Sequence, residues 1–124
     1  MQILQVDDSP LICQLYSDFL ESRSHSVEAV HDGKKGLELV MENDYDMILL
    51  DMLMPKYSGM QFLKDLKEKR PSELKKVIVI SQLEFNEDDY QELLDFGIRS
   101  IQKKTLDLVK FEDKGELEVK HDLV

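Results

Sequence analysis

Residues 47–51 read Met47-Ile48-Leu49-Leu50-Asp51, a short apolar run closed by an acidic residue. A second run of the same kind, at residues 3–6, is closed by Asp7 and Asp8. Short aliphatic runs like these are typical of fully buried strands in a parallel sheet. Because ligands bind just beyond the carboxyl ends of such strands, we expect the three carboxylates to gather at one edge of a sheet.

Three carboxylates held within a few ångströms of one another repel, and each of them resists ionisation. A hard divalent cation relieves this repulsion, and acidic sites rich in oxygen suit Mg²⁺ or Mn²⁺. The sequence therefore predicts a metal site built from Asp7, Asp8 and Asp51, with chemistry that involves a carboxylate.

Strand and helix patterns alternate from the start of the chain to Lys104. The predicted strands cover residues 2–6, 27–30, 47–50, 76–81 and 98–102. Helical spacing of apolar residues fills each interval, and Ser9 and Asn86 are suitable N-caps for the first and last of these helices. This alternation predicts an α/β fold: a doubly wound parallel sheet with right-handed crossovers and helices on both faces.

The pattern changes after Lys104. A fifth helix would be short, and apolar residues between Val109 and Val119 alternate with charged ones around Gly115. This period of two favours a β-hairpin or an irregular tail. The competing interpretation is a frayed, highly charged helix broken at Gly115.

Composition limits the class of protein. The 124 residues fit one domain, and a net charge of −10 argues against direct binding to nucleic acid or to an anionic membrane. No apolar stretch is long enough for a membrane span, and no signal peptide is visible at the N-terminus. The single cysteine, Cys13, allows no internal disulfide and fits a small core residue. We therefore expect a cytoplasmic protein.

Polar residues also close the last two predicted strands. Ser81 ends the fourth strand, and Lys103 or Lys104 ends the fifth. A carboxylate nucleophile, a metal, a hydroxyl and an ammonium group at one sheet edge form a site for accepting a phosphoryl group. The metal and the lysine would neutralise phosphate oxygens, and the hydroxyl would donate to a third oxygen.

At these residues the chain resembles the response-regulator receiver domain, the CheY-like family. The motifs lie at residues 3–9, 46–55 and 77–81, together with Gly59 and the late lysine. The resemblance covers residues 1–106 and implies a flavodoxin-like five-stranded sheet of order 2-1-3-4-5. Residues 107–124 would then be an atypical C-terminal extension, and we expect no output domain within these residues.

The resemblance also implies a role for each site residue. Asp51 matches the phosphoacceptor, while Asp7 and Asp8 match the acidic pair that holds Mg²⁺ together with the backbone carbonyl of Leu53. Ser81 matches the hydroxyl that follows the phosphoryl group.

The lysine that contacts the phosphoryl group is ambiguous. Spacing from Ser81 and the buried Ile101 two positions earlier favour Lys103, whereas spacing from Gly97 favours Lys104. We prefer Lys103 and keep Lys104 as its rival.

The chain departs from the family pattern at several positions. The proline that usually follows the lysine is absent. Ser100 or Ile101 stands where the family carries an aromatic residue on the fifth strand, so a ring that swings inward cannot be the readout. Leu53 and Leu83 lie two residues beyond Asp51 and Ser81. Because polar groups at such positions can orient attacking water, two leucines predict slow self-hydrolysis of the phosphorylated protein.

The implied function is a phosphorylation switch in a two-component system. A sensor histidine kinase or a histidine phosphotransfer protein would donate the phosphoryl group to Asp51, and a downstream protein or a second copy of the chain would read the result. The chain would catalyse only its own phosphorylation and slow dephosphorylation, so it is not expected to be an enzyme with an external substrate. The alternative is a protein-interaction module on the same fold that works without phosphorylation. An aspartyl phosphatase is disfavoured, because Leu53 stands where a second acid would serve as general acid.

Overall fold

The computed structural model describes residues 1–104 and Leu108. Its elements follow in chain order: β1 (Gln2–Val6), α1 (Pro10–Ser22), β2 (Ser26–Val30), α2 (Gly33–Glu42), β3 (Met47–Asp51), α3 (Gly59–Lys69), the 3-10 helix η1 (Pro71–Lys76), β4 (Val77–Ser81), α4 (Glu87–Asp95) and β5 (Ser100–Lys103). The prediction of a hairpin or irregular tail over residues 107–124 lies outside the described residues, apart from Leu108.

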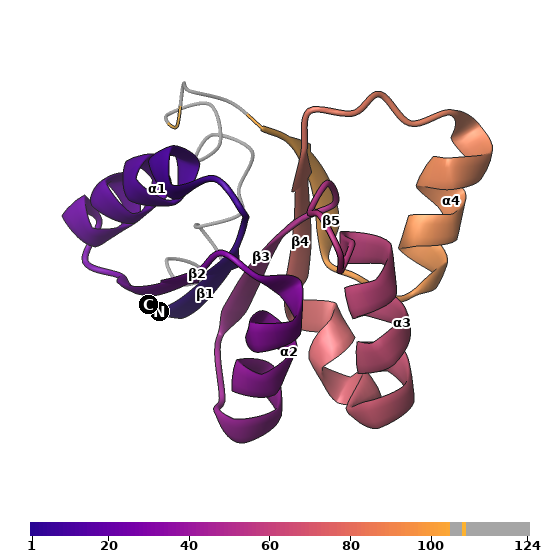
Figure 1. The fold of residues 1–124 in the computed structure, drawn as a ribbon, viewed down its shortest axis with the longest axis horizontal. Coiled ribbons are helices and arrows are strands. Elements are labelled where there is room, and N and C mark those ends of the chain that lie inside the picture. Colours follow the sequence, from indigo (N-terminus) through magenta and orange to yellow (C-terminus); the bar gives the residue numbers. More distant parts are fainter. Residues whose placement is uncertain (105–107, 109–124) are drawn as a thin grey trace, which may run out of the picture.

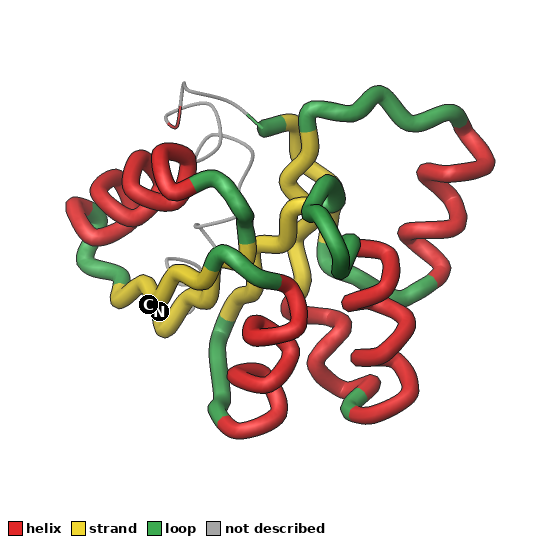
Figure 2. Tube along the Cα trace, viewed as in Figure 1, coloured by secondary structure: helices red, strands yellow, loops and turns green. Residues whose placement is uncertain are grey.

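The five strands form one parallel sheet of order β2-β1-β3-β4-β5, as predicted (Figures 1 and 2). The register pairs Asp51 with Ile80 and Ser81 with Lys103. The carboxyl ends of β3, β4 and β5 therefore meet at the same edge of the sheet, where the sequence predicted a site.

Helices cover both faces of the sheet (Figure 1). On one face, Tyr16 and Leu20 of α1 pack in a core cluster with Ile3, Leu49 and other strand residues. On the opposite face, α2, α3 and α4 pack against the remaining strand side chains. The strands are buried on both sides, which explains why β3 and β4 read as unbroken apolar runs rather than as alternating patterns.

Side-chain caps begin the helices where the sequence places capping residues. The hydroxyl of Ser9 accepts from the backbone N–H of Ile12 at 3.3 Å, and the side-chain oxygen of Asn86 accepts from Asp89 at 2.8 Å. Gly97 follows α4 with φ of 83°, a left-handed conformation that glycine adopts without strain.

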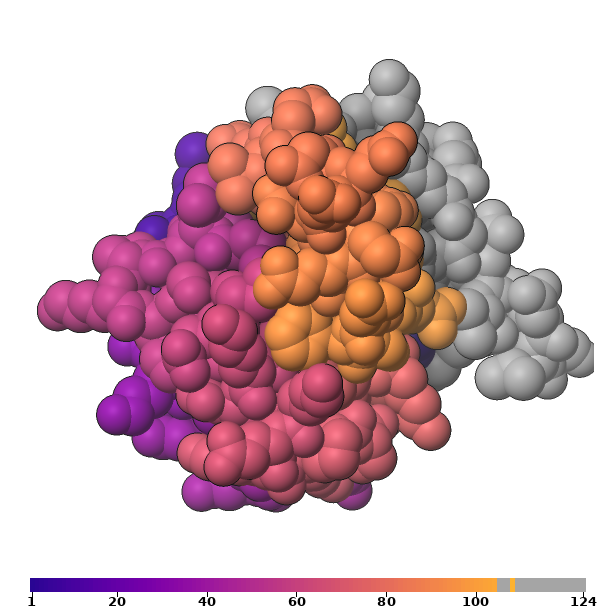
Figure 3. All heavy atoms as spheres, turned by 90° about the vertical axis from the view of Figure 1, so that its right-hand side faces the viewer, coloured from indigo at the N-terminus to yellow at the C-terminus, as the bar shows by residue number. Residues whose placement is uncertain are grey.

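Helix α4 makes few buried contacts with the rest of the protein. Only Leu93 of α4 is buried, and the helix lies at the surface, shown in orange in Figure 3. Among residues 1–104 and 108, no helix has both the length and the apolar character that a membrane span requires.

Two elements differ from the sequence prediction. The 3-10 helix η1 was not predicted, and β5 begins two residues later than expected and ends at Lys103. The end of β5 at Lys103 decides which lysine reaches the predicted site.

Candidate functional site

Three carboxylates converge at the carboxyl edge of the sheet. Oxygen atoms of Asp7, Asp8 and Asp51 all lie within 4.8 Å of one another. Asp7 and Asp51 are buried, with 3% and 4% of their surface exposed, while Asp8 is exposed to solvent. The three carboxylates therefore lie together, as predicted from the two apolar runs that they close, because β1 and β3 are neighbours in the sheet.

Gly59 allows the loop after β3 to fold back against the phosphoacceptor candidate. A Cβ atom at this position would lie 2.6 Å from the carbonyl oxygen of Asp51 and 2.7 Å from the Cα atom of Met52. No side chain fits at these distances, so glycine is required where α3 begins. The close approach fixes the path of the chain immediately after Asp51.

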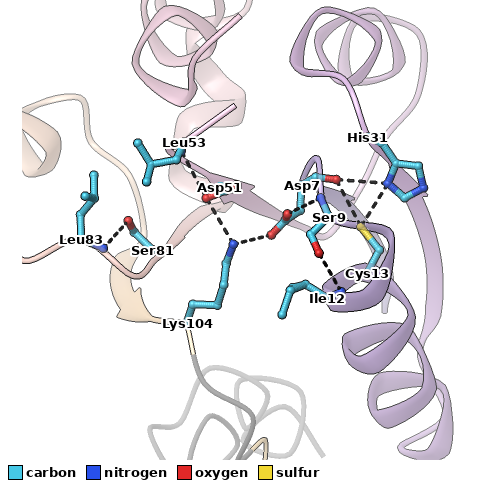
Figure 4. Close-up of polar contacts among 10 residues, drawn as sticks. All are labelled: Asp7, Ser9, Ile12, Cys13, His31, Asp51, Leu53, Ser81, Leu83 and Lys104. Atoms are coloured by element: carbon cyan, nitrogen blue, oxygen red, sulfur yellow. Dashed lines mark hydrogen bonds and ion pairs between the residues drawn. The ribbon is translucent and has the colours of Figure 1, made fainter. Parts of the chain in front are cut away.

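Lys104 lies between the two buried carboxylates. Its Nζ atom is 2.8 Å from Oδ2 of Asp7 and 3.4 Å from Oδ1 of Asp51 (Figure 4). Only 9% of its side chain is exposed, so water screens these contacts little. The ammonium group therefore offsets part of the repulsion between the carboxylates.

The preference for Lys103 is wrong in this structure. The side chain of Lys103 is 57% exposed and pairs with Glu84, in the loop between β4 and α4. Because alternate residues of a strand share a face, Lys103 lies on the same face as Ile101, and that face packs toward the α4 side of the sheet. Lys104 stands one residue beyond the end of β5, and its backbone N–H donates to the carbonyl of Ser81 at 2.9 Å, which leaves its side chain free to reach the acidic edge.

Burial and charge act on the acid–base properties of this cluster. Burial, reinforced by the charge of Asp7, raises the pKa of Asp51 above its ordinary value, although Lys104 and the backbone N–H of Leu53 partly oppose the rise. Burial also disfavours the charged form of Lys104, but the hydrogen bonds and charges of Asp7 and Asp51 outweigh that effect and raise its pKa. The lysine is therefore a permanent cation at physiological pH.

Backbone N–H groups hold the two buried carboxylates in place. The N–H of Ser9 donates to Oδ1 of Asp7 at 2.9 Å, and that of Leu53 donates to Oδ1 of Asp51 at 3.2 Å. Both bonds reach back two residues from the loop that follows each strand. They orient the carboxylates without using all of their oxygen atoms.

This donor set fits a hard divalent cation. It offers three carboxylates with oxygen atoms at short mutual distances, one of them exposed to solvent. Burial and then the charge of Asp7 raise the pKa of Asp51, and a bound cation would favour its charged form against both effects. The residues present therefore suit Mg²⁺ or Mn²⁺, as the sequence predicted.

Ser81 lies at the end of β4 but does not face the cluster directly. Its hydroxyl oxygen accepts from the backbone N–H of Leu83 at 3.0 Å. It lines a cavity of about 260 Å³ on the α4 side, together with Ile101 and Lys103. Ile101, one of the two positions considered for the missing aromatic residue, thus borders the same cavity as the predicted hydroxyl.

A second cavity, of about 250 Å³, opens over the carboxylates. It is lined by Asp8, Ser9, Ile12, Asp51, Leu53, Gln82 and Lys104. Leu53 lines this cavity and is 56% exposed, so the apolar side chain predicted beside Asp51 borders the open space over the carboxylates.

Some of the residues around the cluster were not predicted from the sequence. Gln82 could have been found, since it directly follows Ser81 at a strand end. Cys13, interpreted as a core residue, and His31, which no motif singled out, both contact the carbonyl oxygen of Asp7 (Figure 4). Nothing in the spacing of these two residues indicates that contact, because it depends on how α1 and the end of β2 pack beside β1.

Comparison with known proteins places this geometry in a family. A family model described as the response regulator receiver domain matches residues 3–114. The transcriptional regulatory protein CpxR of Escherichia coli K12 is 35% identical over 99 residues, which cover 72% of this chain and 41% of CpxR. DltR of Streptococcus agalactiae, also named a transcriptional regulatory protein, is 37% identical over 68 residues, covering 55% of this chain and 30% of DltR. The chain thus spans less than half the length of these relatives.

Solved structures show the same fold over nearly the whole chain. The receiver domain of the Francisella response regulator 1452 superposes with a TM-score of 0.77 at 25% identity, covering 96% of this chain and 98% of that domain. A response regulator receiver domain protein from Clostridium thermocellum gives a TM-score of 0.76 at 26% identity, covering 99% and 98%. Together with the family model that matches all but the first two and the last ten residues, these likenesses establish that the chain belongs to the response regulator receiver domains of two-component systems.

Proposed function

We propose that Asp51 accepts a phosphoryl group from a phosphohistidine of a sensor histidine kinase or a histidine phosphotransfer protein. The observation that carries the proposal is the position of Lys104, whose ammonium group contacts both Asp7 and Asp51 at the edge where three carboxylates meet. A cation beside a buried carboxylate, under a cavity open to solvent, suits a dianionic phosphoryl group better than it suits a neutral ligand.

The transfer is a displacement at phosphorus. An oxygen of the Asp51 carboxylate forms a bond to phosphorus while the bond between phosphorus and the donor imidazole nitrogen breaks. The nitrogen keeps the electron pair and takes up a proton from solvent. Lys104 stays charged throughout and is placed to contact an oxygen of the transferred group.

A divalent cation, Mg²⁺ or Mn²⁺, would be held by Asp7, Asp8, Asp51 and the backbone carbonyl of Leu53. When bound, it would neutralise negative charge on the phosphoryl oxygens during transfer. Asp7 and Asp51 are already oriented for this role by the N–H groups of the loops that follow them. The chain modifies only itself under this proposal and turns over no external substrate.

Ser81 provides the response to phosphorylation in this proposal. Its hydroxyl oxygen accepts from the backbone N–H of Leu83, and its O–H group would donate to a phosphoryl oxygen on the neighbouring strand end. A shift of the hydroxyl toward Asp51 would break its hydrogen bond with the N–H of Leu83, which lies in the loop that leads into α4. Because only one residue of α4 is buried, this helix is the element that a small shift can move.

The decisive experiment is intact mass spectrometry after incubation with acetyl phosphate and Mg²⁺. We expect a gain of one phosphoryl group that hydroxylamine removes, present in the wild type and absent in Asp51→Asn. Asp18→Asn, which changes an exposed carboxylate on α1, is the control and should be labelled like the wild type. If the wild type gains no mass where an established receiver is labelled, the proposal fails. The binding module that works without phosphorylation would then be the better interpretation.

The lifetime of the phosphorylated state is a separate prediction. Leu53 borders the cavity over Asp51 and offers no polar group to orient water, so the phosphoryl group should hydrolyse slowly. We expect Leu53→Asn to shorten the half-life of the phosphorylated protein, measured by loss of the added mass after the donor is removed. Leu11→Asn changes a leucine that is 78% exposed and does not border the cavity, and it should leave the half-life unchanged. An equal or longer half-life in Leu53→Asn would contradict the prediction.

A further inference from the structure

The carbonyl oxygen of Asp7 accepts hydrogen bonds from two side chains of different elements (Figure 4). The Sγ atom of Cys13, in α1, lies 3.4 Å from it, and Nδ1 of His31, after the end of β2, lies 3.1 Å from it. The two donors are themselves 3.5 Å apart. Three segments that are distant in sequence therefore meet at one backbone atom.

Both side chains are able to donate to this carbonyl. A carbonyl oxygen can only accept, so the contact of His31 is a hydrogen bond in the tautomer that carries a proton on Nδ1. Burial raises the pKa of the Cys13 thiol to about 12, and the charge of Asp7 reinforces the rise. The thiol is therefore protonated at neutral pH and is able to donate.

This carbonyl belongs to the peptide group that joins Asp7 to Asp8. On the other side of Asp7, its own N–H donates to the carbonyl of Val30 at 3.1 Å. Because a peptide group is planar, holding its oxygen fixes the direction in which the chain continues to Asp8. Asp8 is exposed, so burial does not hold its carboxylate, and the orientation of this peptide group sets where its Cα atom lies.

We propose that His31 and Cys13 are positioning residues, which hold the peptide group between Asp7 and Asp8 so that the carboxylate of Asp8 stays in reach of a divalent cation. The inference rests on the metal site of the proposed function and adds two residues to the machinery that shapes it. Outer contacts of this kind orient metal ligands in many proteins. Here they act through the backbone, since neither side chain is among the three carboxylates that would bind the ion.

The test is the Mg²⁺ affinity of metal-free protein, measured at pH 8 by isothermal titration calorimetry and by the amide chemical shifts of Asp8 and Ser9. We expect His31→Leu to weaken Mg²⁺ binding about tenfold, because it removes one of the two donors. His31→Asn should restore most of the affinity, since the side-chain amide nitrogen of asparagine is attached at the same position as Nδ1. Cys13→Ser should likewise bind Mg²⁺ more tightly than Cys13→Ala.

Gln14→Leu is the matched control. It makes a similar polar-to-apolar change beside Cys13 on α1, but the amide of Gln14 bonds Asp18 instead of the Asp7 carbonyl. An affinity in His31→Leu within twofold of the wild type would overturn the inference, and so would an equal loss in His31→Leu and His31→Asn. A wild type that binds no Mg²⁺ would overturn the metal site of the proposed function as well, which separates that failure from the failure of the positioning role alone.

Discussion

Lys103 and Lys104 are adjacent and chemically identical, yet only one of them faces the acidic edge. Lys104 contacts both buried carboxylates, whereas Lys103 pairs with Glu84 at the surface. We therefore expect Lys104→Met to slow phosphorylation by acetyl phosphate at least about tenfold, because it removes a cation placed beside the transferred group. Lys103→Met should stay within about twofold of the wild type, since exposed ion pairs contribute little. The rate of mass gain under saturating Mg²⁺ checks both variants, and equal losses in the two would contradict the assignment.

Asp51 should weaken the fold at neutral pH when no metal is bound. Its pKa in the folded protein is raised, first by burial and then by the charge of Asp7. Between the ordinary pKa of an aspartate and this raised pKa, the folded protein binds more protons than the unfolded chain. The free energy of unfolding therefore falls as the pH rises through that window, and the loss persists at pH 7. We therefore expect Asp51→Asn to raise the free energy of unfolding at pH 7 in EDTA.

Urea unfolding measured at several pH values tests this expectation. The gain in the free energy of unfolding caused by Asp51→Asn should shrink as the pH is lowered toward the ordinary pKa of an aspartate. Residue 51 of the folded wild type is then neutral, as it is in the variant. A variant that is less stable than the wild type at pH 7 would mean that the ion pair with Lys104 outweighs the burial of the carboxylate.

The carboxylates were predictable from sequence because their position depends only on which strands are neighbours. Asp7 and Asp51 close adjacent buried strands, and a shift of one residue in either strand end would have left them at the same edge. The lysine was not predictable in this way. A single residue at the end of β5 decides which face a side chain takes, and strand ends are set by tertiary contacts that apolar patterns do not record.

At the scale of elements, the side chain of Arg70, which follows α3, forms hydrogen bonds with the C-terminal end of α2. Its Nη1 atom donates to the carbonyls of Val40 and Asn43, at 2.6 and 3.2 Å, and its Nη2 atom pairs with Asp44 at 2.8 Å. Carbonyls at the end of a helix lack partners within the helix, so the guanidinium completes the last turn of α2. The same side chain lies 3.6 Å from the buried carboxylate of Glu73 in η1.

We expect Arg70→Met to lower the free energy of unfolding by about 2 kcal/mol, because charged hydrogen bonds to partly buried groups are lost. Arg70→Lys should recover less than half of this loss, since one ammonium group cannot match the fork of a guanidinium. Lys69→Met, an exposed change one residue earlier, is the control and should cost a few tenths of a kcal/mol. Chemical denaturation measures all three. The network lies at the sheet edge opposite the carboxylates, so a large effect of Arg70→Met on the phosphorylation rate of the folded protein would contradict a purely structural role.

The order of strands and helices followed from periodicity alone, whereas η1 did not. Its six residues contain no helical stripe, and Pro71 and the lysines around it indicate only the end of α3. What makes this segment a 3-10 turn is the burial of Leu74 and Glu73 against the neighbouring elements, with Arg70 and Lys76 pairing with the carboxylate. Such a turn depends on tertiary partners, which a local pattern cannot supply.

At the scale of the whole molecule, two separate groups of acidic residues are distinct components of the net charge of −10. Residues 84–95 carry six acidic and no basic residues, and most of this segment is exposed around α4. The three carboxylates of the site lie apart from it, and two of them are buried. Any dissolved salt screens the first component, whereas only a cation that enters the site relieves the second.

Thermal unfolding should separate these two components. We expect about 10 mM MgCl₂ to raise Tm more than about 30 mM NaCl, which has the same ionic strength. The difference should saturate with Mg²⁺, because a ligand bound only by the folded state stabilises it by RT ln(1 + [L]/Kd), or about 2.7 kcal/mol at a hundredfold excess over Kd. For a domain of this size that energy corresponds to a shift of roughly 10 °C. In Asp8→Asn and Asp51→Asn the advantage of MgCl₂ over NaCl should largely disappear, while the rise caused by NaCl remains, since the acidic segment around α4 is unchanged. Equal shifts in MgCl₂ and NaCl for the wild type would mean that the carboxylates repel one another without forming a specific cation site.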